Sequence, residues 1–600
     1  MNEIINKIVE KHKGDKEQLE VICSEEKRLL VEAPAGYGKT QTMTSKIAYL
    51  LATGKIPNPK KILALTFSVN AAQKIKKDIL KDLPKLDDKF TVNYLNKRIT
   101  ATNYHGFARQ ILRRHGHIYS ENLKKIDLFE VVEDKNEQTL SFYQNKLNLS
   151  EEEIRFIDNF NDAVNRVKRK FIGENMEKYK NLLLEKFIPN KHITYNGLLV
   201  LSFFILEENK NLLKFYRKLY PFIIIDEFQD TNILGFYLIW PFLKEEETSF
   251  LILGDPLQQI YGFIGSIPNI FDKLEKHYNF KKIKLKNNYR FKDKEYLLKI
   301  DKIIREHAKN FGNASIKDED WTKLNIYSTF TQEEEAYKII EIIESIQSKD
   351  ENSNIAILFR VSKTNPNTKK ILEILNQENI SYFYALFSED DSDYRKFHLI
   401  ALTYFISEFR NNPLNKTNWT KFLNILKNSN EIKKLKDRNL VNSLLYLMEI
   451  FYDKEIKIWK NKLSLPKEEI VSNISFIFAE KQLKQYLKYV EEKIIVVTVH
   501  GAKGLEWDYV IVPDMEKYGF PSYLGLCQYC KNINNSDCFL DLINSEEIDK
   551  LYQELSTFYV ACTRAKKDLI FTKSEKRYNS KDNLSSAHIS CFLKLEGFII

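Results

Sequence analysis

The first residues with a chemical pattern form the segment Ala33-Pro34-Ala35-Gly36-Tyr37-Gly38-Lys39-Thr40. A glycine-rich loop that ends in Lys-Thr is typical of a phosphate-binding P-loop. In such a loop backbone N–H groups hold the phosphates, the lysine reaches the outer phosphates and the hydroxyl binds magnesium. The strict pattern has glycine where this chain has Ala33, so the pattern alone leaves an ordinary strand-to-helix turn as the alternative.

A pair of carboxylates, Asp226 and Glu227, forms a second candidate site. The pair follows the apolar run from Phe222 to Ile225, and ligands of α/β proteins bind at the ends of such buried strands. Beside a P-loop, Asp226 would hold magnesium and Glu227 would polarise the water that attacks the γ-phosphate of ATP. Alone, an Asp-Glu pair is a surface turn about as often as a site. Together with the P-loop it predicts an NTPase.

Both candidate sites need strands that end at the reactive residues. Residues 28–32 are predicted to form an apolar strand, and a helical pattern runs from Lys39 to Leu51. Strand, glycine loop and helix in this order are the context of a P-loop. The apolar runs at 222–225 and 354–360 are likewise typical of buried parallel strands. The fold class predicted from these elements is α/β.

Composition describes a folded protein with few glycines. Hydrophobic residues make up 43% of the 600 residues and charged residues 29%, the mixture of an ordinary globular protein with roughly three to five domains. Only 18 residues are glycine, so each is expected where the backbone requires it. Seven of them fall at positions 36, 38, 254, 262, 265, 501 and 504.

Charge, cysteine content and hydropathy place limits on the partners and the compartment. The net charge of +10 permits nucleic-acid binding without proving it. Six cysteines indicate a reducing compartment. No apolar run approaches the ~18 residues of a membrane helix, and the N-terminus lacks the pattern of a signal peptide. We therefore expect a cytoplasmic protein with no membrane partner.

From Gln18 to Arg564 the chain resembles the UvrD/Rep/PcrA-like superfamily 1 DNA helicases. The P-loop is joined, in the family's order, by KEQLEVI around Gln18, TFSVNAA at 66–72, ATNYHGFARQIL at 101–112, DEFQD at 226–230, GDPLQQIYGF at 254–263, NYR at 288–290, TVHGAKGLEW at 498–507 and YVACTRA at 559–565. The resemblance implies two RecA-like motor domains with parallel sheets, each interrupted by a mainly α-helical insertion, that clasp ATP with magnesium.

The resemblance also implies roles around the nucleotide. Gln18 would read adenine, Tyr289 would pack on it and Glu506 would lie near the ribose. Gln258 would sense the γ-phosphate, while Arg290 and the arginine finger Arg564 would neutralise its charge. The implied catalytic residues are Lys39, Asp226, Glu227, Gln258, Arg290 and Arg564; the implied ATP contacts are Gln18, Ala33, Pro34, Ala35, Gly36, Tyr37, Gly38, Lys39, Thr40, Gln41, Tyr289 and Glu506; the implied magnesium ligands are Thr40 and Asp226.

Single-stranded DNA is the second ligand that the resemblance implies. Its contacts would be Thr66, Phe67, His105, Tyr261, Phe263, Thr498 and His500. Stacking on the aromatic side chains suits a strand of any sequence, because every base has a π-face. The alternative is that these aromatic side chains pack in a core. The implied activity is 3′ to 5′ translocation with unwinding of duplex DNA, in repair, recombination or phage defence.

Four positions depart from the family pattern. Gln41 stands where an arginine commonly flanks adenine, Phe263 replaces a tryptophan, Ile264 replaces an arginine and Ala33 replaces the first glycine of the P-loop. None of the four is a hydrolytic residue. The complete phosphoryl-transfer set favours an active ATPase over a scaffold protein that binds nucleotide without turnover.

Some questions of function stay open at the level of the sequence. Only 36 residues follow Arg564, so no fused C-terminal nuclease domain is expected. A separate nuclease or repair protein as partner remains open, as does the choice between unwinding alone and translocation only. Cys527, Cys530 and Cys538 have part of the spacing of a zinc site, but three cysteines favour free loop thiols over a closed four-ligand site.

Motif spacing predicts the domain boundaries. We expect the first motor domain over 1–113 and 190–278, with a helical insertion over 114–189, and the second over 279–385 and 491–600, with a helical accessory insertion over 386–490. The lysine-rich run at 281–286 is expected to be a solvated face, with a phosphate-contacting groove as the alternative.

Overall fold

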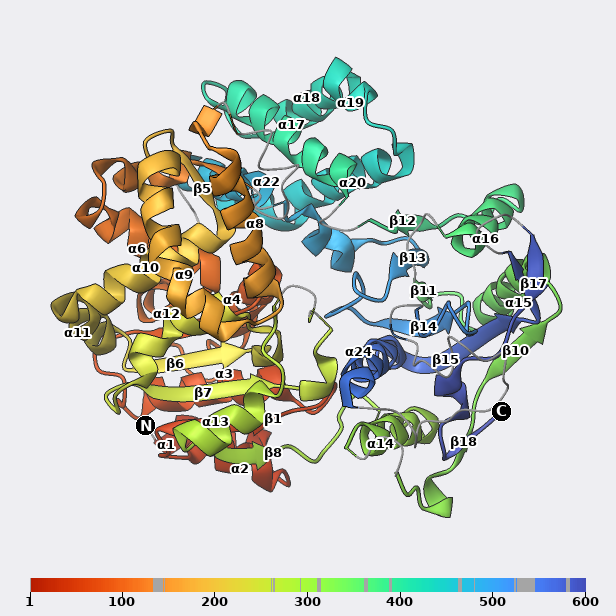
Figure 1. The fold of residues 1–600 in the computed structure, drawn as a ribbon. Helices are drawn as coiled ribbons and strands as arrows, with labels where there is room; N and C mark the ends of the chain where they lie inside the picture. Colours follow the sequence, from red (N-terminus) through yellow and green to blue (C-terminus); the bar gives the residue numbers. More distant parts are fainter. Residues whose placement is uncertain are drawn as a thin grey trace. The chain divides into compact units, whose positions relative to one another are not determined.

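The computed structural model describes residues 2–132, 144, 146–260, 262, 265–291, 293–309, 314–360, 365–387, 391–461, 467–479, 481–522, 525, 545–578 and 583–600. The chain forms two compact units, unit 1 over Met1–Tyr289 and unit 2 over Arg290–Ile600. Each unit contains a six-stranded parallel sheet, as Figure 1 shows. The fold is α/β with a parallel sheet in each unit, as predicted. Within the described ranges, no helix is both long and apolar enough to span a membrane.

The sheet of unit 1 brings the two predicted strands together. Its strands lie in the order β3 (Ile99–Asn103), β2 (Ile62–Thr66), β6 (Phe222–Asp226), β7 (Ser249–Gly254), β1 (Arg28–Glu32) and β8 (Lys281–Lys284). β7 separates β1 from β6 and pairs with both in parallel. The carboxyl ends of β1 and β6 therefore face the same edge of the sheet, where the P-loop and the carboxylate pair begin.

Helices cover both faces of this sheet, which explains why its central strands are apolar throughout. Alternate residues of β1 point to opposite sides, with Leu29 and Val31 in one core and Leu30 in the other. The first core is closed by α1 (Asn2–Lys11), α2 (Lys16–Cys23), α3 (Lys39–Ala52), α4 (Val69–Asp82) and α5 (Val92–Arg98). The second is closed by α6 (Tyr104–His115), α10 (Tyr195–Glu208), α11 (Lys210–Leu219), α12 (Ile233–Leu243) and α13 (Ile270–Tyr278).

The insertion of unit 1 is mainly helical and extends the second core. It contains η1 (Gly116–Ile118), η2 (Glu121–Leu128), α8 (Glu151–Asn165), α9 (Arg169–Leu182), the π-turn η3 (Leu183–Phe187) and the strand pair β4 (Glu130–Val132) and β5 (His192–Thr194). A capping box of Ser150 and Glu153 starts α8. Phe160 of α8 stacks on Tyr179 of α9 at 4.3 Å between ring centroids. Both rings belong to the same core cluster as Leu30 and Leu63 of the sheet, so the insertion packs onto the motor core rather than forming a core of its own.

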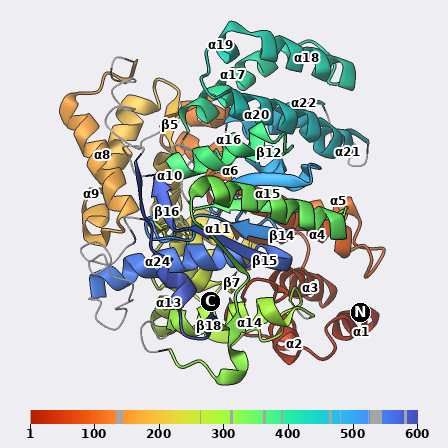
Figure 2. The same cartoon turned by 90° about the vertical axis from the view of Figure 1, so that its right-hand side faces the viewer.

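Unit 2 repeats the architecture, with helices around a second parallel sheet (Figure 2). Its strands lie in the order β10 (Ile326–Thr329), β15 (Ala565–Ser574), β14 (Trp507–Val512), β11 (Ile355–Phe359), β13 (Ile494–Thr498) and β12 (Phe383–Ala385). The helices of this motor part are α14 (Glu295–Lys309), α15 (Gln332–Lys349), α16 (Pro366–Gln377) and α24 (Ser545–Cys562). Two short pairs complete it: β16 (Lys576–Tyr578) with β17 (Leu584–Ser586), and β18 (Phe598–Ile599) with β9 (Thr322–Lys323).

The insertion of unit 2 is helical wherever it has regular structure in the described residues. Its elements are α17 (Ser392–Phe409), α18 (Lys416–Asn428), α19 (Asn430–Lys433), α20 (Arg438–Phe451), η8 (Tyr452–Ile456), α21 (Lys457–Asn461), α22 (Lys467–Ala479) and η9 (Leu483–Tyr489). Trp419 is fully buried and contacts the rings of Phe405, Phe409, Phe422 and Phe451. An aromatic core therefore holds this insertion together.

One predicted boundary differs from the structure. The motif spacing predicts that residues 279–289 belong to the second motor domain, yet β8 pairs with β1 and the segment belongs to unit 1. A strand with alternating lysines is suited to the edge of a sheet, where one side meets water. The lysines pair with carboxylates, Lys281 with Glu20 and Lys282 with Glu32. This agrees with a solvated face and not with a groove for phosphates.

Candidate functional site

The loop between β1 and α3 has the backbone shape of an anion-binding turn. Gly36 and Gly38 have φ angles of +83° and +78°, which glycine adopts without steric cost. Such a loop turns successive backbone N–H groups toward one concavity at the start of a helix, which suits phosphate. The Ala33 N–H donates to the Gly254 carbonyl of β7 at 2.9 Å, so the loop is tied to the sheet.

Glycine is required at one position of this loop and not at another. The φ of +78° would strain any other residue at Gly38, and a Cβ atom there would lie 2.3 Å from Nε2 of Gln18, so it would also displace that amide. Ala33, by contrast, does not have a positive φ and its side chain is buried. The alanine therefore causes no backbone strain where the strict pattern has glycine. The remaining loop residues, Pro34, Ala35, Tyr37 and Thr40, lie between β1 and α3 or at the start of α3, and Gln41 is exposed on its first turn.

Lys39, Asp226 and Glu227 meet where β1 and β6 end. Lys39 is the first residue of α3, Asp226 is the last residue of β6, and Glu227 follows with a left-handed φ of +52°. The Lys39 Nζ lies 3.4 Å from Oδ1 of Asp226 and forms a closer ion pair with Oε1 of Glu227. The P-loop and the carboxylate pair, almost two hundred residues apart in the sequence, therefore form one cluster.

The electrostatics of this cluster leave an excess of negative charge. Burial by itself would lower the pKa of Lys39, but Asp226 and Glu227 outweigh burial and raise it, so the ammonium stays charged. Burial, together with the charge of Glu227, raises the pKa of Asp226 despite the attraction of Lys39. One ammonium thus does not offset two closely placed carboxylates. A divalent cation with oxygen ligands would supply the missing positive charge, so these residues fit magnesium bound with a nucleotide.

A chain of hydrogen bonds extends this cluster to Gln258. Gln229 donates from Nε2 to Oε2 of Glu227 at 2.6 Å and accepts at Oε1 from the Asp255 N–H at 3.2 Å. Asp255 in turn accepts from Nε2 of Gln258 at 2.9 Å. Gln229 and Asp255 were missed as site residues, although both belong to segments that the sequence singled out. The signal was their place directly after the strands β6 and β7.

Gln18 and Tyr289 lie beside the P-loop and are joined through Asp15. The Gln18 N–H donates to Oδ1 of Asp15 at 2.9 Å, and the Tyr289 hydroxyl donates to Oδ2 at 2.6 Å. The Tyr289 N–H also donates to the Gly36 carbonyl at 2.8 Å. Tyr289 is 53% exposed, so its ring is open to a stacking partner. The structure thus places both residues predicted to contact adenine beside the loop that is predicted to hold the phosphates, in contact with its carbonyls.

The two predicted arginines come together within unit 2. Arg290 pairs with Glu506, Nη2 to Oε2 at 2.8 Å, and donates from Nη1 to the Thr563 carbonyl at 2.8 Å. Arg564 is 3% exposed and donates to the carbonyls of Val560 and Leu505. Arg290, Glu506 and Arg564 therefore form a second cluster, in which Glu506 binds an arginine.

Two residues predicted to contact DNA have surroundings that change their interpretation. Thr66 is fully buried between β3 and β6, and its hydroxyl has no hydrogen-bond partner among the described residues. Thr66 is the last position of a buried central strand, so its side chain is not exposed in this structure, and its contact with DNA stays a prediction. His105 lies edge-on to Tyr195, and burial, aided by Arg109, lowers its pKa to about 4. His105 is thus neutral at physiological pH and carries no charge for a phosphate.

The other predicted DNA contacts divide into placed and unplaced residues. Phe67 is half-buried directly after β2. Thr498 ends β13 and accepts from the Gly501 N–H at 3.0 Å, which turns the chain around the half-buried His500. Tyr261, Phe263 and the cysteines 527, 530 and 538 lie outside the described residues.

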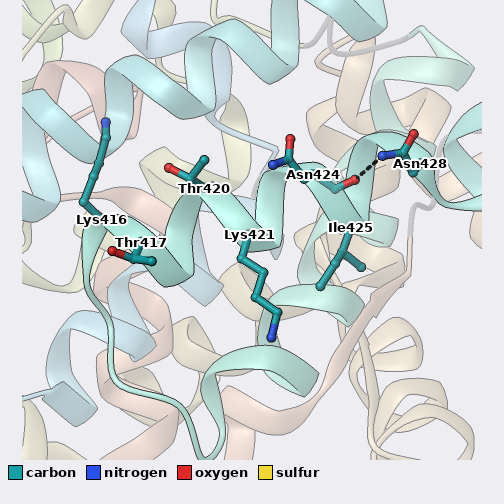
Figure 3. A pocket seen from close by; sticks show the side chains of 7 residues that line it. All are labelled: Lys416, Thr417, Thr420, Lys421, Asn424, Ile425 and Asn428. Carbon is teal, nitrogen blue, oxygen red and sulfur yellow. Dashed lines mark hydrogen bonds between the residues drawn. The ribbon is translucent and has the colours of Figure 1, made fainter.

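A surface pocket of about 740 Å³ lies on α18 in the insertion of unit 2. Figure 3 shows its lining side chains along one helix, with Asn428 donating to the backbone carbonyl of Asn424. The lining residues are Lys416, Thr417, Thr420, Lys421, Asn424, Ile425 and Asn428. They form an exposed helix face and include none of the residues predicted for ATP or DNA.

Comparison with known proteins matches two domains of one family. The UvrD/REP helicase N-terminal domain matches residues 14–279 and the UvrD-like helicase C-terminal domain matches residues 400–576. The "Probable DNA helicase II homolog" of Mycoplasma genitalium is 25% identical over 90% of this chain and 82% of that protein. The "ATP-dependent DNA helicase PcrA" of Bacillus subtilis is 23% identical over 93% of this chain and 82% of that protein.

Proposed function

Because the chain belongs to the UvrD/Rep helicase family and is an ATP-dependent DNA helicase, we propose that it moves 3′ to 5′ along single-stranded DNA and unwinds duplex DNA ahead of it. The observation that carries this proposal is the cluster of Lys39, Asp226 and Glu227, which continues through Gln229 and Asp255 to Gln258. Such a connection allows the state of the nucleotide to be transmitted from the phosphates to the segment after β7.

The phosphate side of the site supplies binding and hydrolysis. Thr40 and Asp226 would hold magnesium, which neutralises phosphate charge when it is bound with ATP. Lys39 exchanges its carboxylate partners for the outer phosphates, and Glu227 is left to accept a proton from the attacking water. Gln258, held by Asp255, responds to the γ-phosphate. Catalysis rests on charge neutralisation and positioning more than on covalent chemistry.

The residues proposed to contact adenine and the two arginines complete the proposed ATP site. Gln18 contacts adenine and Tyr289 stacks on it, while Gln41 flanks the base without the charge of an arginine. Arg290 and Arg564 neutralise the charge that develops on the γ-phosphate. Each is held by acceptors of unit 2, Arg290 by Glu506 and Arg564 by backbone carbonyls. ATP would therefore compete with these acceptors, and Glu506, once released, would be available to the ribose.

DNA contacts are proposed at Phe67, Tyr261, Phe263, Thr498 and His500. Base stacking on aromatic side chains is worth about 1–3 kcal/mol per base and requires no particular sequence. His105 remains in this proposal as a neutral contact, because its lowered pKa excludes a charge-based role. In this proposal the protein holds single-stranded DNA through base stacking and phosphate contacts. It moves along the strand through cycles of ATP binding and release.

The reaction class supports a proposal for the pathway and the partners. We propose a cytoplasmic role in DNA repair, recombination or phage defence, in which single strands are produced and duplexes must be opened. The alternative is a translocase or regulatory subunit that acts with a separate nuclease. Because both use the same ATP site, strand separation by the purified chain distinguishes them.

Unwinding of tailed duplexes tests the proposed function. Duplexes with a single-stranded tail of 3′ or 5′ polarity would be incubated with the purified chain, magnesium and ATP, and strand separation followed by gel. The expected result is separation of the 3′-tailed duplex, and none without ATP. A preference for the 5′ tail would contradict the direction, and ATP-driven tracking without separation would favour the translocase.

A further inference from the structure

A buried histidine, His12, connects Gln18, which is predicted to contact the base, with α3, the helix that follows the P-loop. His12 follows α1 and is 4% exposed. Its Nδ1 forms a short hydrogen bond with Oε1 of Gln18, and its Nε2 lies 2.7 Å from Oγ of Ser45. Ser45 belongs to α3, the helix that begins at Lys39. One imidazole ring therefore contacts both the glutamine predicted to meet the base and the helix of the P-loop.

The hydrogen bonds fix which way the Gln18 amide points. Gln18 Nε2 donates to the Tyr37 carbonyl at 3.3 Å. Because a carbonyl oxygen only accepts, this contact identifies the nitrogen of the amide, and the oxygen faces His12. The amide oxygen also only accepts, so His12 carries its proton on Nδ1. Nε2 is then bare and accepts from the hydroxyl of Ser45. Burial lowers the pKa of His12, which agrees with a neutral ring that has one N–H.

A second anchor holds the backbone of Gln18. Asp15 is 2% exposed, caps the start of α2 by accepting from the Gln18 N–H, and also accepts from the Tyr289 hydroxyl. Main chain and side chain of Gln18 are thus fixed by different residues. Asp15 fixes the position of Gln18, and His12 with Tyr37 fixes the plane of its amide.

The fixed amide has one donor and one acceptor left. A glutamine amide has two N–H groups and two oxygen lone pairs, and Tyr37 and His12 take one of each. Adenine presents an amino donor beside the N7 acceptor, whereas guanine presents two acceptors, O6 and N7. The remaining N–H and the remaining oxygen lone pair of the Gln18 amide therefore match adenine. Guanine would instead place its acceptor O6 against the amide oxygen, and two acceptors form no hydrogen bond.

We propose that His12 is a positioning residue that fixes the Gln18 amide and thereby makes the site select adenine over guanine nucleotides. The proposal rests on the proposed function, because it takes Gln18 as the contact to the base. Terminal amide torsions have broad energy wells, so without His12 the amide rotates. A rotated amide offers an N–H to O6 of guanine and loses its fixed match to adenine.

The test compares His12→Leu and His12→Asn with the parent chain. Leucine removes the hydrogen bond to Gln18, whereas the asparagine amide nitrogen can take the place of Nδ1 and donate to Gln18. Affinities for ATP and GTP with magnesium would be measured by calorimetry, and steady-state hydrolysis of both with excess single-stranded DNA. His12→Leu should weaken ATP binding about 3- to 10-fold, the range of one hydrogen bond. The ratio of the affinities for ATP and GTP should decrease by the same factor. The kcat at saturating ATP should stay within about twofold of that of the parent chain.

The matched variants separate positioning from folding. His12→Asn should restore most of the ATP preference. His398→Leu removes a buried histidine of the unit 2 insertion that, among the described residues, forms hydrogen bonds with the backbone groups of Tyr394 and Leu483, so it should lower thermal stability without changing the preference. Combining His12→Leu with Gln18→Ala should change affinity no more than Gln18→Ala alone, because both act through one contact.

Three results would contradict the proposal. An unchanged ATP to GTP affinity ratio in His12→Leu, or equal effects of leucine and asparagine, would overturn the proposal. A parent chain that binds both nucleotides equally would overturn it too. Failure of the proposed function is seen separately, as selective ATP binding by the parent without DNA-dependent hydrolysis.

Discussion

Glu227 combines an unusual backbone conformation with two polar partners at the end of a buried strand. It follows a buried strand with a left-handed φ of +52°, a conformation that is uncommon outside glycine and asparagine. Its two carboxylate oxygens contact Lys39 and Gln229. In the proposed reaction Lys39 turns to the phosphates, and Glu227, without its cation, would bind a proton more readily.

Glu227→Gln is therefore expected to separate binding from hydrolysis. The amide retains the shape of the side chain but accepts no proton, so ATP binding should persist while turnover falls about 10²–10⁴-fold. Binding would be measured by calorimetry and turnover by phosphate release with single-stranded DNA. The exposed Glu25→Gln serves as control. Turnover near that of the parent would show that Glu227 is not the base.

Arg564→Ala should affect the transition state more than the ground state. An arginine finger contributes about 10³–10⁵ in rate in related phosphoryl transfer, so kcat should fall by a factor in this range with little change in ATP affinity. Because Arg564 is buried and bonded to backbone carbonyls, thermal stability must be measured alongside kinetics. Loss of ATP affinity with unchanged kcat would contradict the role.

At the scale of elements, the parallel strands and the loops at their carboxyl ends could be predicted from the sequence. Apolar runs at 222–225 and 354–360 have the continuous hydrophobicity of strands covered on both faces, and the structure confirms them as β6 and β11. The edge strand β8 was not predicted, because its alternating lysines resemble a solvated loop. Likewise Thr66 and His105 belong to recognisable motifs, but burial depends on neighbouring elements that no local pattern describes.

Unit 2 contains a buried carboxylate cluster that connects α15, β15, β16 and the segment after β14. Glu335, Asp514 and Glu516 are all buried around Arg577, whose guanidinium lies 3.1 Å from Glu516 and 3.5 Å from Asp514. Burial raises the pKa of Glu516 to about 7, with Arg577 opposing and Asp514 adding to the shift. Because three carboxylates face one arginine, the cluster favours a state in which one carboxyl group keeps its proton.

The stability of unit 2 should consequently fall as pH rises. Glu516 binds its proton more strongly folded than unfolded, so its contribution is complete below about pH 4.5 and is lost as pH rises through 7. The expected decrease in the free energy of unfolding is on the order of 1–3 kcal/mol. Urea unfolding across this pH range would measure it. Glu516→Gln should flatten the slope, the exposed Glu373→Gln should not, and equal slopes in all three proteins would contradict the assignment.

At the scale of the whole molecule, we propose that charge and stacking determine how the chain binds DNA. A net charge of +10 is compatible with binding to the phosphate backbone, and the proposed aromatic stacking would add affinity without base selectivity. Affinity for single-stranded DNA should therefore fall steeply with salt, about 10-fold or more between 50 and 200 mM, and vary little between oligonucleotides of different sequence. Fluorescence anisotropy would measure both. Salt-independent binding, or strong preference for one sequence, would contradict grip by phosphate contacts and stacking.

ATP hydrolysis stimulated by single-stranded DNA is the measurement that tests most directly whether the cluster of Lys39, Asp226 and Glu227 drives a DNA motor. Phosphate release would be followed for the parent, for Lys39→Ala and for the exposed control Lys13→Ala, each with and without an oligonucleotide. The parent and Lys13→Ala should be strongly stimulated by DNA, and Lys39→Ala should be reduced at least about 10²-fold while keeping its circular dichroism spectrum. Substantial DNA-stimulated turnover by Lys39→Ala, or turnover by the parent that ignores DNA, would contradict it.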